Sequence, residues 1–179
     1  DVYKRQGQPL NVGLDAGPIF DQKETFSQVQ PKVSLAWVPS EQVTFFANWG
    51  IGFKSGGFNN SGSRATIEGT FNSPLIDANL NISDQFEKET SSAFEVGTKA
   101  LFMDGRLTFD AAAYYTDIDD MQFFEFFAGP FGILRVVSNI DETEVYGVEA
   151  AFSFAATDRW TIFGSANAND SEIKANSAR

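Results

Sequence analysis

Residues 43–53 read VTFFANWGIGF and residues 93–102 read AFEVGTKALF, so that large apolar residues alternate with small or polar ones. Successive side chains of a β-strand point to opposite faces, and strict alternation therefore predicts strands with one apolar and one polar face. No segment keeps the apolar spacing of an amphipathic helix through two turns. The alternation predicts strands over residues 26–38, 42–54, 90–103, 106–118, 139–155 and 159–169.

The two faces of these strands differ sharply in composition. On one face every residue except Thr98 and Gly164 is apolar and none is charged, although 21% of the chain is charged. A lipid-facing band requires this, because Lys or Arg at the bilayer midplane costs about 2–4 kcal/mol. The other face is rich in small and polar residues, as expected of a water-filled lumen. Its charged members are Glu95, Lys99, Asp110 and Glu149.

Short and long connections alternate along the chain. Pro39-Ser40-Glu41, Asp104-Gly105 and Ala156-Thr157-Asp158 have tight-turn compositions, whereas residues 55–88 and 119–138 are much longer connections. All short turns then fall at one end of the sheet. The pattern predicts an all-β fold: a fragment of an antiparallel transmembrane β-barrel of about six strands in three hairpins, with short periplasmic turns and long extracellular loops. A soluble β-sandwich also alternates and stays open as an alternative.

Aromatic residues gather near both ends of the apolar face. The chain has 19 Phe, 4 Tyr and 3 Trp. Membrane barrels carry aromatic girdles at both interfaces, whereas a sandwich would place its large aromatics toward the middle of its core. We predict membrane-interface positions for Trp37, Phe102, Phe154 and Trp160 near the short turns, and for Phe53, Tyr115 and Tyr146 near the long loops.

Composition excludes several functional classes. The chain contains no His and no Cys, which removes the Ser-His-Asp and Cys-His catalytic pairs, structural zinc sites and Cys- or His-ligated clusters. Its net charge of −11 gives no basic footprint for nucleic acid. Glu95, Asp110 and Glu149 could converge as paired carboxylates, but lumen-facing charges need no catalytic explanation. We expect no enzyme, no cofactor, no metal site and no nucleic-acid partner.

The second long connection contains the most unusual composition, a Phe-rich run. Exposed aromatics on an outer loop could contact an apolar or aromatic ligand such as a metal chelate, with an arginine for an anionic one. The alternative is structural: the run extends the barrel wall as a hairpin that turns at Gly129-Pro130. The ligand-loop candidates are Phe123, Phe124, Phe126, Phe127 and Arg135.

Acidic residues flank the same connection. They do not match the twelve-residue EF-hand spacing, so a solvated face at the level of the lipopolysaccharide headgroups is the better interpretation. Shared divalent ions between these carboxylates and anionic headgroups remain a hypothesis. The residues are Asp117, Asp119, Asp120, Asp141, Glu142 and Glu144.

Several blocks resemble the barrel of TonB-dependent outer-membrane receptors, the siderophore and nutrient receptor family. The similarity runs from about residue 25 to residue 170. Five blocks in the right order are more specific than any one of them. They are residues 31–41, 49–59, 86–99, 104–107 and 137–149, which include Trp49-Gly50-Ile51-Gly52-Phe53-Lys54-Ser55-Gly56-Gly57-Phe58-Asn59, Phe94-Glu95-Val96-Gly97-Thr98-Lys99 and Tyr146-Gly147-Val148-Glu149.

The resemblance implies the bacterial outer membrane, a barrel of about 22 strands and a lumen-filling plug. It implies active uptake of a scarce nutrient, above all a ferric siderophore, with outer-membrane lipid, the inner-membrane energy-coupling protein TonB and a metal chelate or other small molecule as partners. Residues 7–179 then form a partial barrel domain without plug, coupling box or remaining strands, and we interpret residues 1–6 as a non-native scar. A porin-like passive channel and a soluble sandwich binding module are the alternatives.

Overall fold

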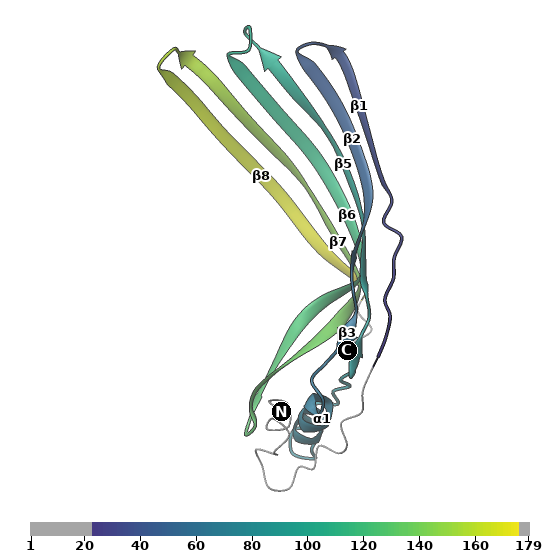
Figure 1. Cartoon of the computed structure of the whole chain (residues 1–179). Coiled ribbons are helices and arrows are strands. Elements are labelled where there is room, and N and C mark those ends of the chain that lie inside the picture. Colours follow the sequence, from purple (N-terminus) through teal and green to yellow (C-terminus); the bar gives the residue numbers. More distant parts are fainter. Residues whose placement is uncertain (1–22, 176–179) are drawn as a thin grey trace, which may run out of the picture.

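The computed structural model describes residues 23–175 of the chain. Six strands form one antiparallel sheet, and two short strands and one helix lie beyond one of its ends (Figure 1). The scar predicted at residues 1–6 lies outside the described residues. The elements are β1 (Lys32–Ser40), β2 (Val43–Lys54), β3 (Gly57–Phe58), α1 (Ser63–Phe71), β4 (Gln85–Phe86), β5 (Glu89–Phe102), β6 (Leu107–Gly129), β7 (Gly132–Thr157) and β8 (Trp160–Ala175).

The main sheet is an open, curved meander in the order β1-β2-β5-β6-β7-β8. The three tight turns lie together at its upper end in Figure 1, and the long connection between β2 and β5 lies at the opposite end. This arrangement confirms the predicted all-β antiparallel fold, with the three predicted tight turns at one end of the sheet. The turn from β5 to β6 uses three successive left-handed residues, of which Gly105 (φ 83°) meets no steric cost.

The register of the strands separates an outer face from an inner face. One continuous row of the outer face pairs Leu35, Ala47, Val96, Ala113, Val148 and Ala168 across all six strands. The next row belongs to the inner face and pairs Ala36, Phe46, Gly97, Ala112, Glu149 and Asn167. Side chains of the outer face are large, apolar and exposed: Leu35 is 67% and Val96 57% exposed. A lipid environment would cover such a face.

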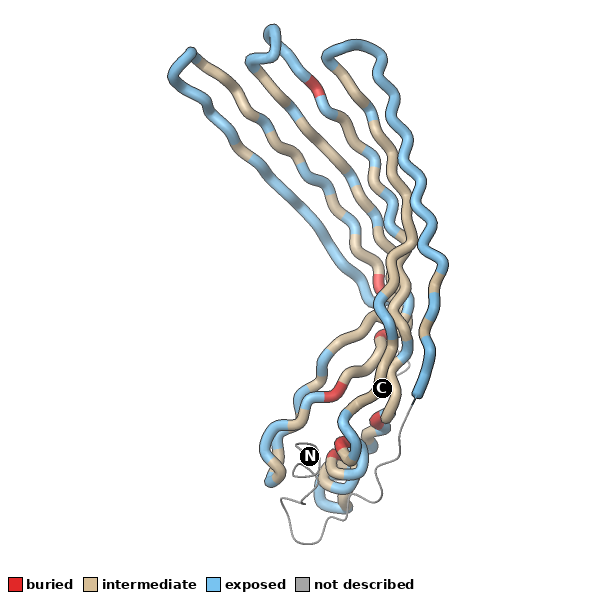
Figure 2. Tube along the Cα trace, viewed as in Figure 1, coloured by how far each residue is buried: buried red, intermediate tan, exposed pale blue. Residues whose placement is uncertain are grey.

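The main sheet has no hydrophobic core of its own. Among the described residues, the buried apolar side chains are few, and most belong to segments beyond the end of the sheet (Figure 2). A soluble sandwich packs two sheets about 10 Å apart around a shared core. The second sheet in the described part of the chain is only the pair β3–β4. The structure therefore supports the barrel wall and not the sandwich.

The first strand begins later than the alternation predicts. Strand β1 starts at Lys32, not at residue 26. Pro31 has no N–H and cannot donate to the ladder, although its carbonyl still accepts a hydrogen bond from the Ile51 N–H at 3.0 Å. Before Pro31 the chain leaves β2, and the Lys88 ammonium donates to the carbonyl oxygen of Ser27 and to the side-chain oxygen of Gln28.

The loop predicted over residues 119–138 is wrong. Strands β6 and β7 continue through it as a paired hairpin that turns between Gly129 and Gly132, which is the structural alternative weighed for the Phe-rich run. Asp120 interrupts the pairing at the base of this extension with a left-handed backbone (φ 53°). We call residues 121–140 the arm; it leaves the sheet at the lower end in Figure 1.

The arm packs against the connection between β2 and β5, which we call the helical segment (residues 55–88). Ile67 of α1 and Val136 of the arm are fully buried, and Ile82 is 5% exposed. The rings of Phe71 and Phe127 meet edge to face with centroids 5.6 Å apart. This small apolar cluster makes the arm and the helical segment one packed body, visible as the buried positions at the lower end of Figure 2.

Candidate functional site

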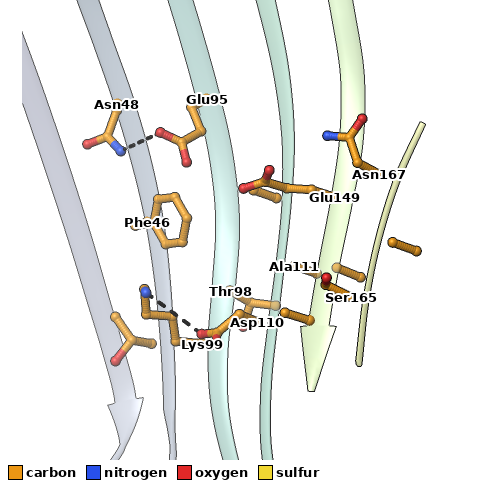
Figure 3. Close-up of a pocket in the computed structure, with 15 residues that line it drawn as sticks. Phe46, Asn48, Glu95, Thr98, Lys99, Asp110, Ala111, Glu149, Ser165 and Asn167 are labelled. Atoms are coloured by element: carbon orange, nitrogen blue, oxygen red, sulfur yellow. Dashed lines mark hydrogen bonds and ion pairs between the residues drawn. The ribbon is translucent and has the colours of Figure 1, made fainter. Parts of the chain in front are cut away.

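The inner face of the main sheet forms a hollow of about 630 Å³ (Figure 3). Four strands from β2 to β7 and the edge strand β8 contribute to its lining, which consists of inner-face residues together with a few neighbours from the other parity of the same strands. Asn48 and Glu95 lie on one side of the Phe46 ring, Glu149 lies in the same ladder row as Phe46, and Lys99 and Asp110 lie on the other side. The remaining polar lining residues are Thr44, Thr98, Ser165 and Asn167.

The charged groups of the hollow are only partly neutralised. The Asn48 side-chain amide donates to the Glu95 carboxylate at 3.1 Å, and the Lys99 ammonium lies 3.7 Å from the Asp110 carboxylate. Three carboxylates thus face one ammonium. Glu95 thus accepts a hydrogen bond from an amide of the neighbouring strand, and Asp110 forms an ion pair with Lys99 of the neighbouring strand. Such contacts are typical of a hydrated barrel wall and not of a catalytic acid and base. The hollow therefore presents net negative charge.

Two aromatic rings of the inner face lie over glycines of the neighbouring strand. A Cβ added at Gly97 would collide with the Phe46 ring, and one added at Gly147 would lie 2.6 Å from the Tyr114 hydroxyl. The register pairs each ring directly with its glycine. These rings cover exposed backbone and shape the hollow. The sequence predicts a small-residue face but not this pairing, because the pairing depends on the register of the strands.

The arm divides the predicted ligand-loop candidates between two faces. Phe127 packs against Phe71 of α1, and Phe123 occupies the same face of β6 and is half-buried. Phe124 and Phe126 lie on the opposite face and are 57% and 67% exposed. Phe127 is thus taken up by the packing between arm and helix, whereas Phe124 and Phe126 stay exposed; contact of these candidates with a ligand stays a prediction.

The exposed face of the arm carries a cation over an aromatic ring. The Arg135 guanidinium lies 4.5 Å from the centroid of the Phe124 ring. The register pairs Arg135 directly with Phe126. Ile133, 74% exposed, continues this apolar surface toward the turn. We call Phe124, Phe126, Ile133 and Arg135 the aromatic patch.

Amide side chains attach the helical segment to the arm. The Asn59 side chain donates to the Val137 carbonyl at 2.9 Å and accepts from the Val137 N–H at 2.7 Å, as a paired strand residue would. The Asn139 side chain accepts from the Glu87 N–H at 2.8 Å and donates to the Asp120 carbonyl at 2.7 Å. Isolated Asn residues carry no sequence signal for such contacts, so these contacts could not be predicted from the sequence.

Charged groups converge where the arm leaves the sheet. The Lys54 ammonium lies 2.7 Å from the Glu89 carboxylate, which also accepts the Gln122 N–H at 2.8 Å. Asp120 lies beyond the apolar band of the outer face. Burial raises the pKa of its carboxyl above the ordinary value, and the negative charges of Asp119, Glu87 and Asp141 raise it further.

The predicted interface aromatics lie at two levels of the outer face. Trp37 stacks on Phe45 with centroids 5.5 Å apart close to the first tight turn, and Trp160 is 72% exposed beside the last. At the other end Tyr115 and Tyr146 pair directly, in one ladder row with Trp49 and Phe94. Phe53 lies four pairs farther along, opposite Thr90. Phe102 ends β5 and pairs with Leu107, which pairs with Phe154.

No helix within residues 23–175 is long and apolar enough to cross a membrane. No group of three or more acidic side chains in this range is arranged to hold a metal ion.

The comparison with protein families assigns the fold. Residues 1–178 match the model of the TonB-dependent receptor-like β-barrel. The chain belongs to this family. TonB-dependent receptors are outer-membrane proteins of Gram-negative bacteria, and they are transporters rather than enzymes, as the sequence leads us to expect. No curated protein matches the chain.

Solved structures with a similar fold include one transporter and two receptors. The copper transporter OprC shares 15% sequence identity, with a TM-score of 0.58, and the match covers 80% of this chain and 20% of that one. The ferric yersiniabactin uptake receptor FyuA from Yersinia pestis shares 22% identity, with a TM-score of 0.58, and the match covers 82% of this chain and 19% of that one. The alcaligin outer-membrane receptor FauA from Bordetella pertussis shares 17% identity, with a TM-score of 0.53, and the match covers 82% of this chain and 23% of that one. The chain thus spans about a fifth of the length of these receptors.

Proposed function

We propose that this TonB-dependent receptor barrel takes up a scarce nutrient actively, and that its substrate is a metal chelate, most specifically a ferric siderophore. The observation that carries the proposal is the aromatic patch. It places exposed rings and one guanidinium on a hairpin that is held from behind by a packed helix. Rings and a cation with little conformational freedom suit an anionic, partly aromatic ligand.

The polar inner hollow is compatible with passage of the substrate through the barrel lumen, controlled by a plug that fills the lumen. Its negative charge is complementary to a lumen-filling segment that carries basic residues, and we propose that the receptor's plug occupies it. Energy would then reach the plug through TonB. Outer-membrane lipid covers the outer face, whose exposed Trp and Tyr residues we propose as interface anchors.

The proposal concerns the complete receptor, so the test uses it. Cells that depend on the receptor for growth under metal starvation would carry Phe124→Ala, Phe126→Ala or Arg135→Ala, and uptake of ferric and cupric chelates would be measured. We expect a loss of affinity of about ten-fold or more for each variant, as for central aromatic and Arg contacts elsewhere. Leu75→Ala, at an apolar residue 96% exposed in the helical segment, is the matched control.

Arg135→Lys separates the contribution of charge from that of the planar guanidinium. A chelate recognised by stacking and bidentate bonds would lose affinity with Lys almost as with Ala. Unchanged uptake in all three patch variants would contradict the assignment of the patch.

A porin-like channel is the second candidate, because the polar inner face would also suit passive diffusion. The two differ in their need for energy. Uptake that stops when a protonophore collapses the inner-membrane potential supports the receptor. Uptake that persists, and scales linearly with ligand concentration, supports the channel.

A further inference from the structure

The aromatic patch carries a cation that no acidic side chain neutralises. Arg135 is exposed, and it forms no ion pair with any carboxylate of residues 23–175. The chain as a whole has a net charge of −11. In so acidic a chain, an exposed arginine without a carboxylate partner, placed beside exposed rings, is suited to bind an anion from outside the protein.

The register of the arm keeps negative charge away from this arginine. Residues 121–140 contain one acidic residue, Glu125. Glu125 pairs with Val136, which is fully buried against the helical segment, and directly paired residues share a face. The Glu125 carboxylate also accepts a hydrogen bond from the Ser138 hydroxyl at 2.8 Å. The acidic residue therefore belongs to the packed face, and the charge on the exposed face of the arm is positive.

The position of Arg135 leaves its hydrogen-bond donors available. The guanidinium carbon lies 4.5 Å from the centroid of the Phe124 ring, within the range of a cation–π contact. In the described part of the chain this ring is its partner, and no carbonyl or carboxylate oxygen accepts a hydrogen bond from it. A guanidinium carries five N–H donors in a planar fork that matches two adjacent oxygens.

The two exposed rings supply an aromatic surface next to this fork. Phe124 and Phe126 are two residues apart on β6 and therefore point to the same face. They are 57% and 67% exposed, and Arg135 pairs directly with Phe126. Aromatic groups of a ligand stack on such rings in offset or edge-to-face arrangements. The patch thus offers ring contact and paired N–H donors at one place.

This combination distinguishes two chemical classes of ferric chelate. A catecholate arm is a benzene ring with two adjacent anionic oxygens, whereas a hydroxamate arm has no ring. A ferric hydroxamate complex with a full coordination shell is neutral. The corresponding catecholate complex stays anionic, because each catecholate carries one more negative charge than a hydroxamate. Only the catecholate complex matches both the rings and the cation of the patch.

We propose that the aromatic patch selects ferric chelates with catecholate arms over ferric chelates with hydroxamate arms. The Arg135 fork binds the adjacent oxygens of one arm, and Phe124 and Phe126 contact its ring. This inference rests on the proposed uptake of a metal chelate and names the class of chelate.

The test measures binding to the purified complete receptor in detergent. The probes are the ferric complexes of two synthetic tripodal chelators that share one backbone, one with catecholate and one with hydroxamate arms. Equilibrium dialysis with radioactive iron gives the Kd of each. We expect the catecholate complex to bind about tenfold more tightly or better, because a hydrogen bond to a charged group has about that effect on affinity.

Arg135→Lys keeps the positive charge but removes the planar fork, so it should abolish most of the preference by weakening catecholate binding alone. Phe124→Leu keeps an apolar side chain but removes the ring, and it should act in the same direction. Arg64→Lys is the matched control, since Arg64 is also exposed but its guanidinium already pairs with Glu68 and Asp84. It should bind both chelates as the parent does. Heat-modifiable gel mobility checks that each variant is folded.

The outcomes separate this inference from the proposed function. Equal binding of the two chelates, or tighter binding of the hydroxamate complex, would overturn the catecholate preference and leave chelate uptake standing. A preference that survives in both patch variants, or that Arg64→Lys abolishes equally, would overturn the assignment to the patch. If neither chelate binds the parent receptor, the proposed function fails together with the inference.

Discussion

The barrel wall and the extracellular unit, meaning the arm with the helical segment, are stabilised in opposite ways. The wall exposes large apolar side chains and buries almost nothing within itself, since its outer face is meant for lipid and its edges for further strands. The extracellular unit buries Ile67, Ile82 and Val136 in a core of its own, and hydrogen bonds from Asn side chains to backbone groups add to its stability. The wall therefore depends on lipid and on neighbouring strands for its stability, whereas the extracellular unit is stabilised by its own buried core.

The largest expected effect concerns the 179-residue chain expressed alone. Within residues 23–175, strands β1 and β8 are the edges of the main sheet and each leave one row of N–H and C=O groups without a strand partner. Because lipid and detergent offer these groups no partners, we expect no stable monomer. Gel mobility with and without heating, together with thermal unfolding in detergent, checks this. A compact, heat-modifiable, cooperatively unfolding monomer would refute it.

A second test compares the two neighbouring alanines of β6 that point to opposite faces. Ala113 lies on the outer face between Val96 and Val148, and Ala112 lies on the inner face between Gly97 and Glu149. In the complete receptor, Ala113→Arg should lower the free energy of unfolding by about 2–4 kcal/mol, as for Arg at a bilayer midplane. Urea unfolding in liposomes measures it.

Ala112→Arg is the control for that substitution. It adds the same side chain within reach of a lumen carboxylate, so it should cost much less. Equal losses from both variants would mean that the outer face does not contact lipid.

A third test addresses the core of the extracellular unit. Ile67→Ala removes a fully buried side chain and should lower the local stability of that unit by about 2–4 kcal/mol, without affecting the wall. Hydrogen exchange of amides in α1 and the arm would accelerate, whereas exchange in β2 and β5 would not. Leu75→Ala, at a residue 96% exposed, should change neither. Acceleration throughout the barrel would show that the two regions unfold as one.

The smallest effect on stability is expected for loss of the hydrogen bonds between the Asn59 side chain and the Val137 backbone. Asn59→Ala leaves the Val137 N–H and C=O without their side-chain partner, which costs about 1–3 kcal/mol for partly buried groups. The adjacent Asn60→Ala, at an exposed side chain, is the control. The hydrogen-exchange rate of the Val137 amide should rise in Asn59→Ala only. A similar rise in both variants would contradict a stabilising role for the Asn59 side chain.

The sequence was informative where one physical demand governed each residue. Alternation placed all six strands of the main sheet to within two residues at the ends that join tight turns. It failed at Pro31, where the missing N–H matters more than apolar spacing. It also failed for α1, whose residues read SRATIEGTF and bury only Ser63 and Ile67, so that no apolar stripe marks the helix.

The Phe-rich arm shows why alternation can vanish inside a strand. One face of the arm packs on α1 and the other carries the aromatic patch, so both are apolar and the period of two disappears. The candidate site divided in the same way. Phe124, Phe126 and Arg135 are exposed together, whereas Phe127 serves the packing with Phe71 and Phe123 shares its face.

The sequence by itself determined the family, the all-β topology and the two faces of the wall, because a bilayer imposes apolar residues at every second position. Only the tertiary structure decided which aromatic rings remain exposed, how Asn59 and Asn139 attach the helical segment, and where Asp119, Asp120, Asp141 and Glu87 converge. Those features depend on contacts between segments up to 78 residues apart in sequence, where register and packing, not local pattern, select the partner.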